Sequence, residues 1–178
     1  LSCMAENEWT TKKKVIGVSF DGTGYGTDGT IWGGEILLAD YDSFKRWGCI
    51  EPFAQTGGDA SAKEGWRIAV SLLGKIYGKE IALSIIETLG LCESKLAKLQ
   101  FTMEERGINT VKSTSAGRLF DAVSAILGIR KASTFEGEAS TSLQFAAEKW
   151  LDSQEEKIAG YEDFVESGVI TEYREEQK

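Results

Sequence analysis

The chain contains no histidine and a single proline among its 178 residues. Without histidine it can supply no imidazole ligand to a metal ion. Its three cysteines, Cys3, Cys49 and Cys92, are far apart and form no Cys-x-x-Cys pair, so they do not indicate a zinc site. An odd number of widely separated cysteines favours reduced thiols that are partly buried.

Long apolar runs and basic clusters are also missing. No apolar stretch approaches the length of a membrane helix and no basic-then-apolar leader opens the chain, so we expect a cytoplasmic protein with no membrane contact. The net charge of −8 comes from residues 134–178, which hold 12 acidic and 4 basic side chains. Residues 1–133 balance at 16 of each sign. This distribution favours a solvated acidic face and argues against a nucleic-acid partner.

Glycine is concentrated in one place, with seven glycines among the eighteen residues from Gly17 to Gly34. An apolar strand over Val15–Phe20 leads into Asp21, and a second strand over Thr30–Ala39 returns as a hairpin. Glycine backbone can approach a phosphate closely, and its N–H groups can converge on an anion. The run predicts either a phosphate-binding hairpin or a plain glycine-rich turn.

Elsewhere the pattern predicts an α/β fold in which strands precede helices. A third strand over Phe44–Phe53 completes an antiparallel β-meander within residues 13–54. Helical spacing begins at Asp59, a suitable N-cap, and defines a helical region over 58–157. The expected apolar stripe of its first helix is Trp66, Ala69, Val70, Leu73 and Ile76. Further helices are expected at about 79–89, 93–106, 115–127 and 138–157, and short strands at 161–165 and 169–173.

Asp21 is the first candidate for chemistry. A carboxylate that ends an apolar strand at a hairpin mouth can hold a divalent metal ion, although an Asx turn is the plain alternative. We expect the Thr23 hydroxyl and the backbone N–H groups of Gly22, Gly24 and Gly26 to face the oxygens of a phosphate or a similar ligand group. Asp28 and Glu35 are interpreted as structural.

Two helix starts supply the other candidates. Gly57-Gly58-Asp59 combines close backbone approach with a carboxylate that would repel phosphate, so a ribose hydroxyl is its expected ligand, with simple N-capping as the alternative. At the second start, Ser113–Arg118, we expect Arg118 to pair with Asp121 on the helix surface. Such an i, i+3 pair contributes about 0.2–0.5 kcal/mol.

Four segments in order resemble the HypF family of carbamoyltransferases. They are Asp21–Glu35 (Asp-Gly-Thr-Gly-Tyr-Gly-Thr-Asp-Gly-Thr-Ile-Trp-Gly-Gly-Glu), Thr56–Ala60 leading to Trp66-Arg67, Ser115–Val123, and Phe135–Ala139. The resemblance implies a partial TsaD-like domain over residues 1–178, with the fold of an actin-like (ASKHA) subdomain. It also implies that Ser115, Gly117 and Asp121 line a nucleotide cleft.

The resemblance further implies the chemistry of an intact parent. HypF proteins use carbamoyl phosphate and ATP, through carbamoyl-adenylate, to carbamoylate the C-terminal cysteine of HypE during [NiFe]-hydrogenase maturation. Their divalent metal is held partly by histidines that this chain lacks, so we expect an internal fragment that is inactive alone. The alternatives are a nucleotide-binding module without transferase activity and a small-molecule O-carbamoyltransferase.

Overall fold

The structure is a computed structural model that describes residues 1–153. The chain divides into two compact units, Leu1–Leu143 and Gln144–Lys178, and the boundary falls within the last described helix. The strands predicted at 161–165 and 169–173, and the end of the helix predicted to reach residue 157, lie outside the described residues. No helix within residues 1–153 has the length and apolar character needed to cross a membrane.

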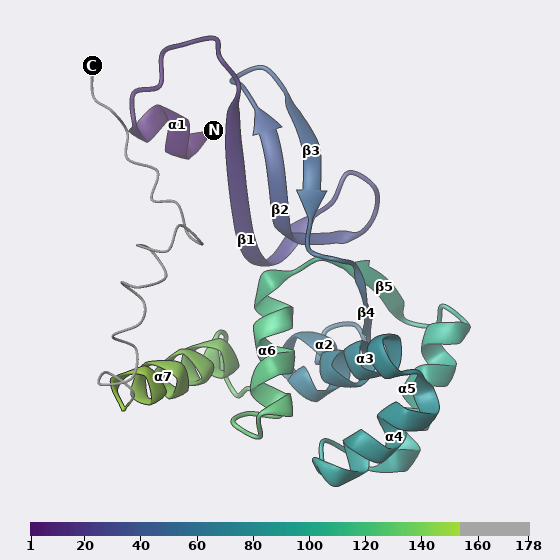
Figure 1. The fold of residues 1–178 in the computed structure, drawn as a ribbon. Coiled ribbons are helices and arrows are strands. Elements are labelled where there is room, and N and C mark those ends of the chain that lie inside the picture. Colours follow the sequence, from purple (N-terminus) through teal and green to yellow (C-terminus); the bar gives the residue numbers. More distant parts are fainter. Residues whose placement is uncertain (154–178) are drawn as a thin grey trace, which may run out of the picture. The chain divides into compact units, whose positions relative to one another are not determined.

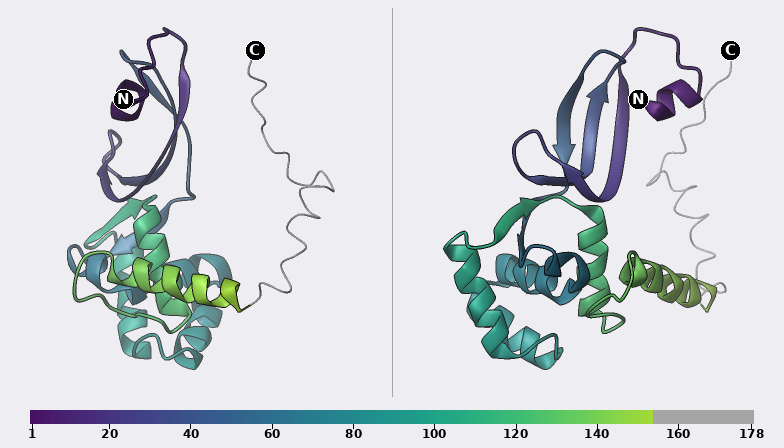
Figure 2. Two further views of the ribbon diagram at one scale, coloured as in Figure 1. Left: turned by 90° about the vertical axis from the view of Figure 1, so that its left-hand side faces the viewer. Right: turned by 180° about the vertical axis from the view of Figure 1, so that it is seen from behind.

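Three antiparallel strands form the predicted meander (Figure 1). After the short helix α1 (Ser2–Glu6), β1 (Val15–Tyr25) pairs with β2 (Ile31–Ala39), and β2 pairs with β3 (Phe44–Cys49). Figure 2 shows these strands side by side from two further directions. The prediction of a meander is confirmed.

The glycine run differs from its prediction in one respect, because β1 does not end at Phe20. The strand continues through the glycines to Tyr25, with a shift in register between Phe20 and Gly24. Such a shift bends a strand locally and breaks the regular ladder, which is how residues next to it can be turned toward a site. The glycines after Asp21 are therefore part of an irregular strand rather than a free loop.

The third predicted strand is divided in two at Pro52. Beyond the end of β3, Phe53–Thr56 forms a separate strand, β4, which pairs antiparallel with β5 (Thr110–Ser113). A proline cannot donate to a strand ladder, so its position between two strands is physically reasonable. The short strand β5 joins β2 in parallel at Ile31 and Ser113, inside a region that the pattern predicted as helical.

The helical region starts with two helices where one was predicted. Asp59 precedes α2 (Ala60–Lys63), but its side chain makes no capping hydrogen bond, and α3 (Gly65–Tyr77) begins two residues after α2 ends. On α3, Ala69, Val70 and Leu73 are buried as expected and Trp66 is partly buried, whereas Ile76 is exposed.

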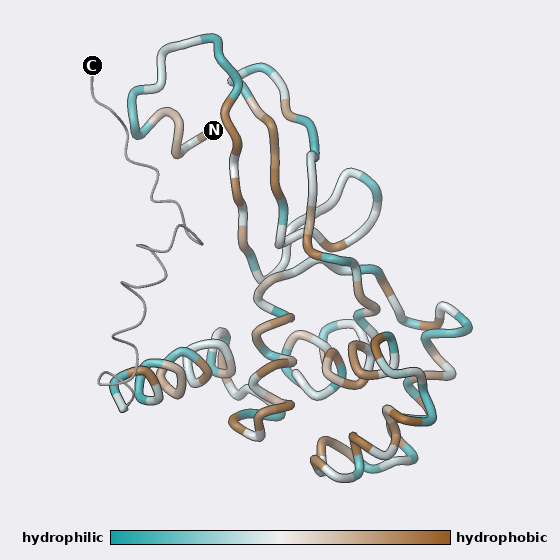
Figure 3. Tube along the Cα trace, viewed as in Figure 1, coloured by the Kyte–Doolittle hydropathy of each residue, from teal (hydrophilic) through white to brown (hydrophobic). Residues whose placement is uncertain are grey.

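The remaining helices agree closely with the predicted spans: α4 (Lys79–Thr88), α5 (Ser94–Glu105), α6 (Ala116–Ile126) and α7 (Glu138–Asp152). The hydrophobic core lies among α3 to α6 and β4, where Ile68 and Ile86 are fully buried. Figure 3 shows hydrophobic stretches along these helices and along β1 and β2. The helix α6 also packs against β1, which places its first turn beside the glycine-rich strand.

Candidate functional site

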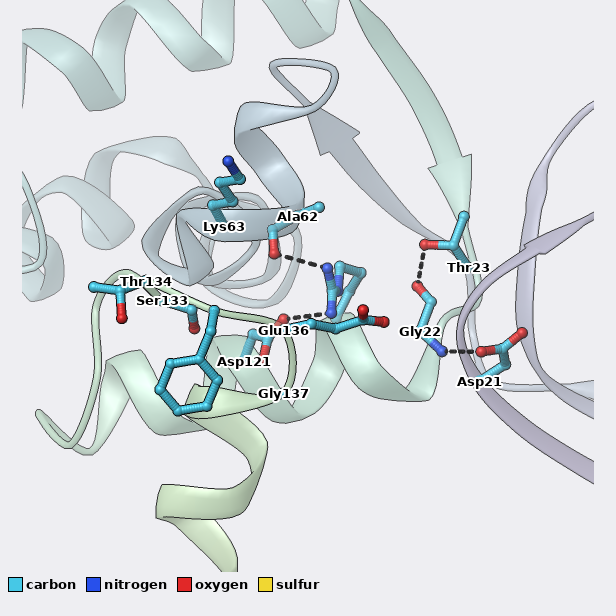
Figure 4. Close-up of a pocket in the computed structure, with 12 residues that line it drawn as sticks. Asp21, Gly22, Thr23, Ala62, Lys63, Asp121, Ser133, Thr134, Glu136 and Gly137 are labelled. Carbon is cyan, nitrogen blue, oxygen red and sulfur yellow. Dashed lines mark hydrogen bonds and ion pairs between the residues drawn. The ribbon is translucent and has the colours of Figure 1, made fainter.

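A pocket of about 300 Å³ lies where β1, α2, α6 and the loop before α7 meet (Figure 4). Its walls bring together residues that are far apart in sequence. They are Asp21, Gly22, Thr23, Ala62, Lys63, Arg118, Asp121 and residues 133–137. The pocket therefore unites Asp21, Gly22, Thr23 and Asp121, four of the residues that the sequence singled out.

The β1 side of the pocket carries the predicted carboxylate and hydroxyl. Asp21 and Thr23 are exposed, and the Asp21 carboxylate accepts the N–H of Gly22 at 2.6 Å. The Thr23 hydroxyl donates to the Gly22 carbonyl oxygen at 2.6 Å. The Gly22 N–H therefore has an acceptor in its own strand, and its role as a donor to an anion stays a prediction.

Gly24 and Gly26 lie outside the lining of this pocket. The Gly26 N–H donates to the carbonyl oxygen of Thr30 at 3.0 Å, so it offers no free donor. A Cβ at Gly24 would lie 2.8 Å from the Trp32 carbonyl oxygen, and one at Gly26 would lie 2.4 Å from the Trp32 ring. Close packing against Trp32 explains both glycines, and the binding of an anion by their N–H groups stays a prediction.

The first turn of α6 faces the pocket from the other side. Ser115 is the N-cap, and its hydroxyl oxygen accepts the Arg118 N–H at 3.1 Å. The same hydroxyl lies 2.8 Å from the Gly22 carbonyl oxygen. Ser115 is buried and Gly117 half-buried between α6 and β1, and a Cβ at Gly117 would lie 2.8 Å from the Gly22 Cα. They shape the pocket without lining it.

Arg118 and Asp121 form an ion pair inside the pocket wall. Arg118 Nη2 lies 2.9 Å from the Asp121 carboxylate, and Nη1 donates to the Ala62 carbonyl oxygen at 2.8 Å. The predicted pairing is confirmed, but its predicted place on the helix surface is wrong, since both side chains are buried. Burial raises the pKa of Asp121, and the positive charge of Arg118 opposes that rise.

The loop before α7 forms a wall that the sequence left without a role. Thr134 donates its N–H and hydroxyl to Glu138, at 2.7 and 3.0 Å, and Glu138 also pairs with Arg130 at 3.1 Å. These bonds hold the segment that carries Phe135 and Glu136 at the pocket. The resemblance at Phe135–Ala139 was the available signal for this wall. No comparable signal pointed to Lys63, Ser133 or Thr134.

The Gly57-Gly58-Asp59 corner adjoins a second pocket of about 440 Å³, which Gly58 and Asp59 line. Gly57 and Gly58 have φ angles of +113° and +56°, which favour glycine. The two pockets share Thr23 and Ala62 in their linings. Asp21 and Asp59 therefore face adjoining pockets that meet at common residues.

The residues present do not by themselves make a metal centre. Within residues 1–153 no group of three His, Cys, Asp or Glu side chains is arranged to hold a metal ion. Asp21 is one carboxylate in the pocket lining, and a single protein carboxylate holds a divalent cation such as Mg²⁺ only together with waters or substrate phosphates.

The described residues form a mixed α/β fold with a pocket of about 300 Å³ between a glycine-rich strand and the start of a helix, and this arrangement fits an actin-like fold. A family model described as "Carbamoyltransferase, Kae1-like Domain, second subdomain" matches residues 17–172, and the chain belongs to this family.

Named relatives agree with this assignment. The chain is 39% identical over 148 residues to carbamoyltransferase HypF of Rhodobacter capsulatus, covering 82% of this chain and 19% of that protein. It is 41% identical over 136 residues to probable carbamoyltransferase HypF of Methanocaldococcus jannaschii, covering 76% and 18%. The chain thus spans about a fifth of the length of these relatives.

Solved structures show the same similarity. A full-length HypF, described as its phosphate- and nucleotide-bound form, superposes with a TM-score of 0.70 at 37% identity, covering 79% of this chain and 18% of that one. The HypF of T. kodakarensis gives a TM-score of 0.63 at 30% identity, covering 73% of this chain. These likenesses fit the expected actin-like fold and the expectation of an internal part of a longer protein.

Proposed function

We propose that this chain is the phosphate- and nucleotide-binding part of a HypF-type carbamoyltransferase. The intact parent would use carbamoyl phosphate and ATP to form carbamoyl-adenylate, then transfer the carbamoyl group to the C-terminal cysteine thiolate of HypE in the cytoplasm, during [NiFe]-hydrogenase maturation. Membership of the family and the names of the relatives support the reaction class. One solved HypF is in a phosphate- and nucleotide-bound form, which supports the ligands.

The observation that carries the proposal is the gathering of Thr23, Lys63 and Arg118 around one pocket. The Lys63 ammonium group and the Thr23 hydroxyl are suited to phosphate oxygens, and the partial positive charge at the start of α6 adds to their attraction. The charge of Arg118 is balanced by Asp121, and the lining also holds the carboxylates of Asp21 and Glu136, so phosphate would enter together with a cation that offsets them. Lys63 is exposed, and none of the ion pairs in the described residues involves it, so its ammonium group is available to an anion.

The adjoining pocket would receive the sugar of the nucleotide. Asp59 repels phosphate but accepts hydrogen bonds from ribose hydroxyls, and Asn109 and Gly58 line the same pocket. A divalent metal ion in the intact protein would offset the charge of the phosphates. Asp21 is the group of this chain that would reach it, and the remaining ligands would come from other parts of the parent. Alone, the chain is expected to bind phosphate and nucleotide but not to catalyse carbamoyl transfer.

The test is a chemical-shift titration of the isotopically labelled chain with inorganic phosphate and with ATP and Mg²⁺. We expect dissociation constants in the millimolar range, about −4 kcal/mol, because only one side of the site is present. Asp21→Ala should weaken Mg-ATP binding, and Asp59→Ala should weaken ATP binding but not phosphate binding. Asp42→Ala, an exposed aspartate in the β2–β3 turn, is the matched control.

Two outcomes would oppose the proposal. Tight binding that neither substitution affects would place the ligand elsewhere, and the absence of any phosphate or ATP binding would remove the site. For the parent, carbamoyl transfer to a small molecule in place of a HypE C-terminal peptide would favour the O-carbamoyltransferase alternative. Nucleotide binding without any transfer would favour the nucleotide-binding module.

A further inference from the structure

Glu35 is a buried carboxylate outside the pocket lining, and only 3% of its surface is exposed. It lies in β2 and accepts four donors. Arg46 Nε lies 2.6 Å from Oε2, while Oε1 accepts the Thr114 hydroxyl and the N–H groups of Gly33 and Gly34, the last two at 3.2 and 3.4 Å. Burying a carboxylate is costly unless it is paired and hydrogen-bonded. The four donors around Glu35 meet that requirement.

One of those donors leads directly to the pocket. Thr114 immediately precedes the N-cap of α6, and its N–H donates to the Ile31 carbonyl oxygen at 2.9 Å. The next residue, Ser115, contacts the carbonyl oxygens of Asp21 and Gly22 at 3.0 and 2.8 Å. Two neighbouring residues, Thr114 and Ser115, therefore join Glu35 to the strand that carries the pocket carboxylate, one bonded to Glu35 and the other to β1.

The two glycines before Glu35 lie where β1, β2 and the start of α6 meet, and this junction has no room for a side chain. A Cβ at Gly33 would lie 2.5 Å from the Asp21 carbonyl oxygen and 3.0 Å from the Ser115 Cα. A Cβ at Gly34 would lie 2.5 Å from the Thr114 carbonyl oxygen. β1, β2 and the start of α6 touch through their backbones, and the separation of the two pocket walls follows from this contact.

The opposite end of the network anchors the hairpin loop. Arg46 pairs with Asp28 at 3.1 Å and stacks over the Trp32 ring at 4.3 Å. Asp28 in turn accepts the Trp32 Nε1–H at 2.9 Å and both the N–H and the hydroxyl of Thr30. Through these contacts Glu35 connects the hairpin loop, β3 and the start of α6.

We infer that Glu35 is a positioning residue for the anion-binding pocket. Through Thr114 and Ser115 it holds the first turn of α6 against Asp21 and Gly22, and so sets where Arg118 stands relative to Thr23. This inference rests on the proposed function, because the pocket is the one that we propose to bind phosphate. Glu35 itself touches no ligand in this arrangement.

Three variants test the role. Glu35→Gln keeps the size of the side chain and an oxygen that can accept the Thr114 hydroxyl. It removes the negative charge and places an amide NH₂ group opposite Arg46. Thr114→Val keeps the shape and removes the hydroxyl, and Thr114→Ser restores it. Glu105→Gln changes an exposed, Lys79-paired carboxylate in the same way as Glu35→Gln and is the matched control. All measurements are made at temperatures at which circular dichroism shows each variant fully folded.

Two readouts separate positioning from general stability. In the ligand-free chain, exchange of the Arg118 N–H and the amide shifts of Gly22 and Thr23 should change in Glu35→Gln and Thr114→Val but return in Thr114→Ser. Inorganic phosphate should bind on the order of tenfold more weakly to the first two variants and normally to the third. Glu105→Gln should match the unaltered chain in both readouts.

The outcomes distinguish the two claims. Unchanged exchange and shifts around Gly22 and Arg118 in Glu35→Gln would overturn the positioning role, whether or not phosphate binds. Normal phosphate affinity in a folded Glu35→Gln or Thr114→Val variant would overturn it as well. If the unaltered chain binds no phosphate while the local exchange responds as expected, the proposed function fails and the mechanical link to Glu35 stands.

Discussion

Arg118 and Asp121 face each other across 2.9 Å with 11% and 7% of their side chains exposed. The pair is one turn apart on α6, and the same guanidinium donates to the Ala62 carbonyl oxygen. Its second terminal nitrogen lies 3.7 Å from where a Cβ would stand at Gly22. One buried cation therefore joins α2, α6 and the glycine-rich strand beneath the pocket.

Breaking this pair from the acidic side should be costly. Asp121→Ala leaves a buried guanidinium without its counter-charge, for which we expect a loss of about 3–5 kcal/mol in the free energy of unfolding. The double variant Arg118→Met with Asp121→Leu removes both charges and should be clearly more stable than Asp121→Ala. Urea denaturation measures both, and a double variant no more stable than Asp121→Ala would contradict the buried-pair interpretation.

Gly33 should tolerate no side chain. In Gly33→Ala the new methyl group would meet the Asp21 carbonyl oxygen and the Ser115 Cα, both backbone atoms, so the strands must shift. We expect a loss of about 1–3 kcal/mol. Gly17→Ala is the matched control in the same hairpin, because its nearest neighbour would be the Leu37 carbonyl oxygen at 3.9 Å. Equal urea midpoints for the two variants would show that the junction is looser than these distances indicate.

The sequence predicted elements whose signal is local. Alternating apolar residues and helical spacing are sufficient for the existence of the β1–β2 hairpin and of α4, α5 and α6. The ends of these three helices agree with prediction within about two residues. The short strands β4 and β5 were missed because four residues give too little periodicity, and their pairing joins segments more than fifty residues apart. That pairing is a tertiary property.

The candidate site divides in the same way. Asp21 and Thr23 were readable because they follow an apolar run directly, and the Arg118–Asp121 pair was readable from its i, i+3 spacing on a predicted helix. The place of Asp121 in a nucleotide cleft came from the family resemblance. The sequence could not reveal why these positions are glycine. At Gly24, Gly26 and Gly117 a side chain would collide with atoms that come close only in the folded chain. Glu35 was interpreted as structural, but nothing in the sequence connects it to Thr114, 79 positions away.

The pH dependence of stability should carry the signature of Glu35. Burial raises the pKa of Glu35, but hydrogen bonds from Arg46, Thr114 and the two glycine amides outweigh burial and hold it below its usual value. The unfolded chain then binds a proton at a higher pH than the folded chain does. The contribution of Glu35 to the free energy of unfolding is fully present above the ordinary glutamate pKa of about 4.3. It is lost as the pH falls through the lowered pKa of the folded chain.

Glu35→Gln should therefore flatten part of the acid limb of the stability curve. Free energies of unfolding from urea titrations between about pH 3 and pH 6 give this slope for both proteins. Glu138 also has a lowered pKa, held down mainly by the Thr134 N–H, so some slope should remain in the variant. An unchanged slope in Glu35→Gln would show that Glu35 has the same pKa in the folded and unfolded chains.

β1 should make the isolated chain self-associate. It pairs only with β2 among the described strands, and alternation places Ile16, Val18 and Phe20 on one face, with 64%, 63% and 65% of each residue exposed. A strand with one unpaired edge, an apolar face and no proline or lysine along its length is a site for edge pairing or face-to-face association. Sedimentation velocity should show an average mass that rises with protein concentration.

A charge on that face should suppress the association. Val18→Lys places an ammonium group in the middle of the apolar stripe, whereas Ser19→Lys places the same charge on the opposite face of the same strand. If the stripe drives association, Val18→Lys stays monomeric at concentrations at which Ser19→Lys still associates. Equal suppression by both would assign the contact to the backbone edge of β1, and association that neither variant alters would place it on another surface of the chain.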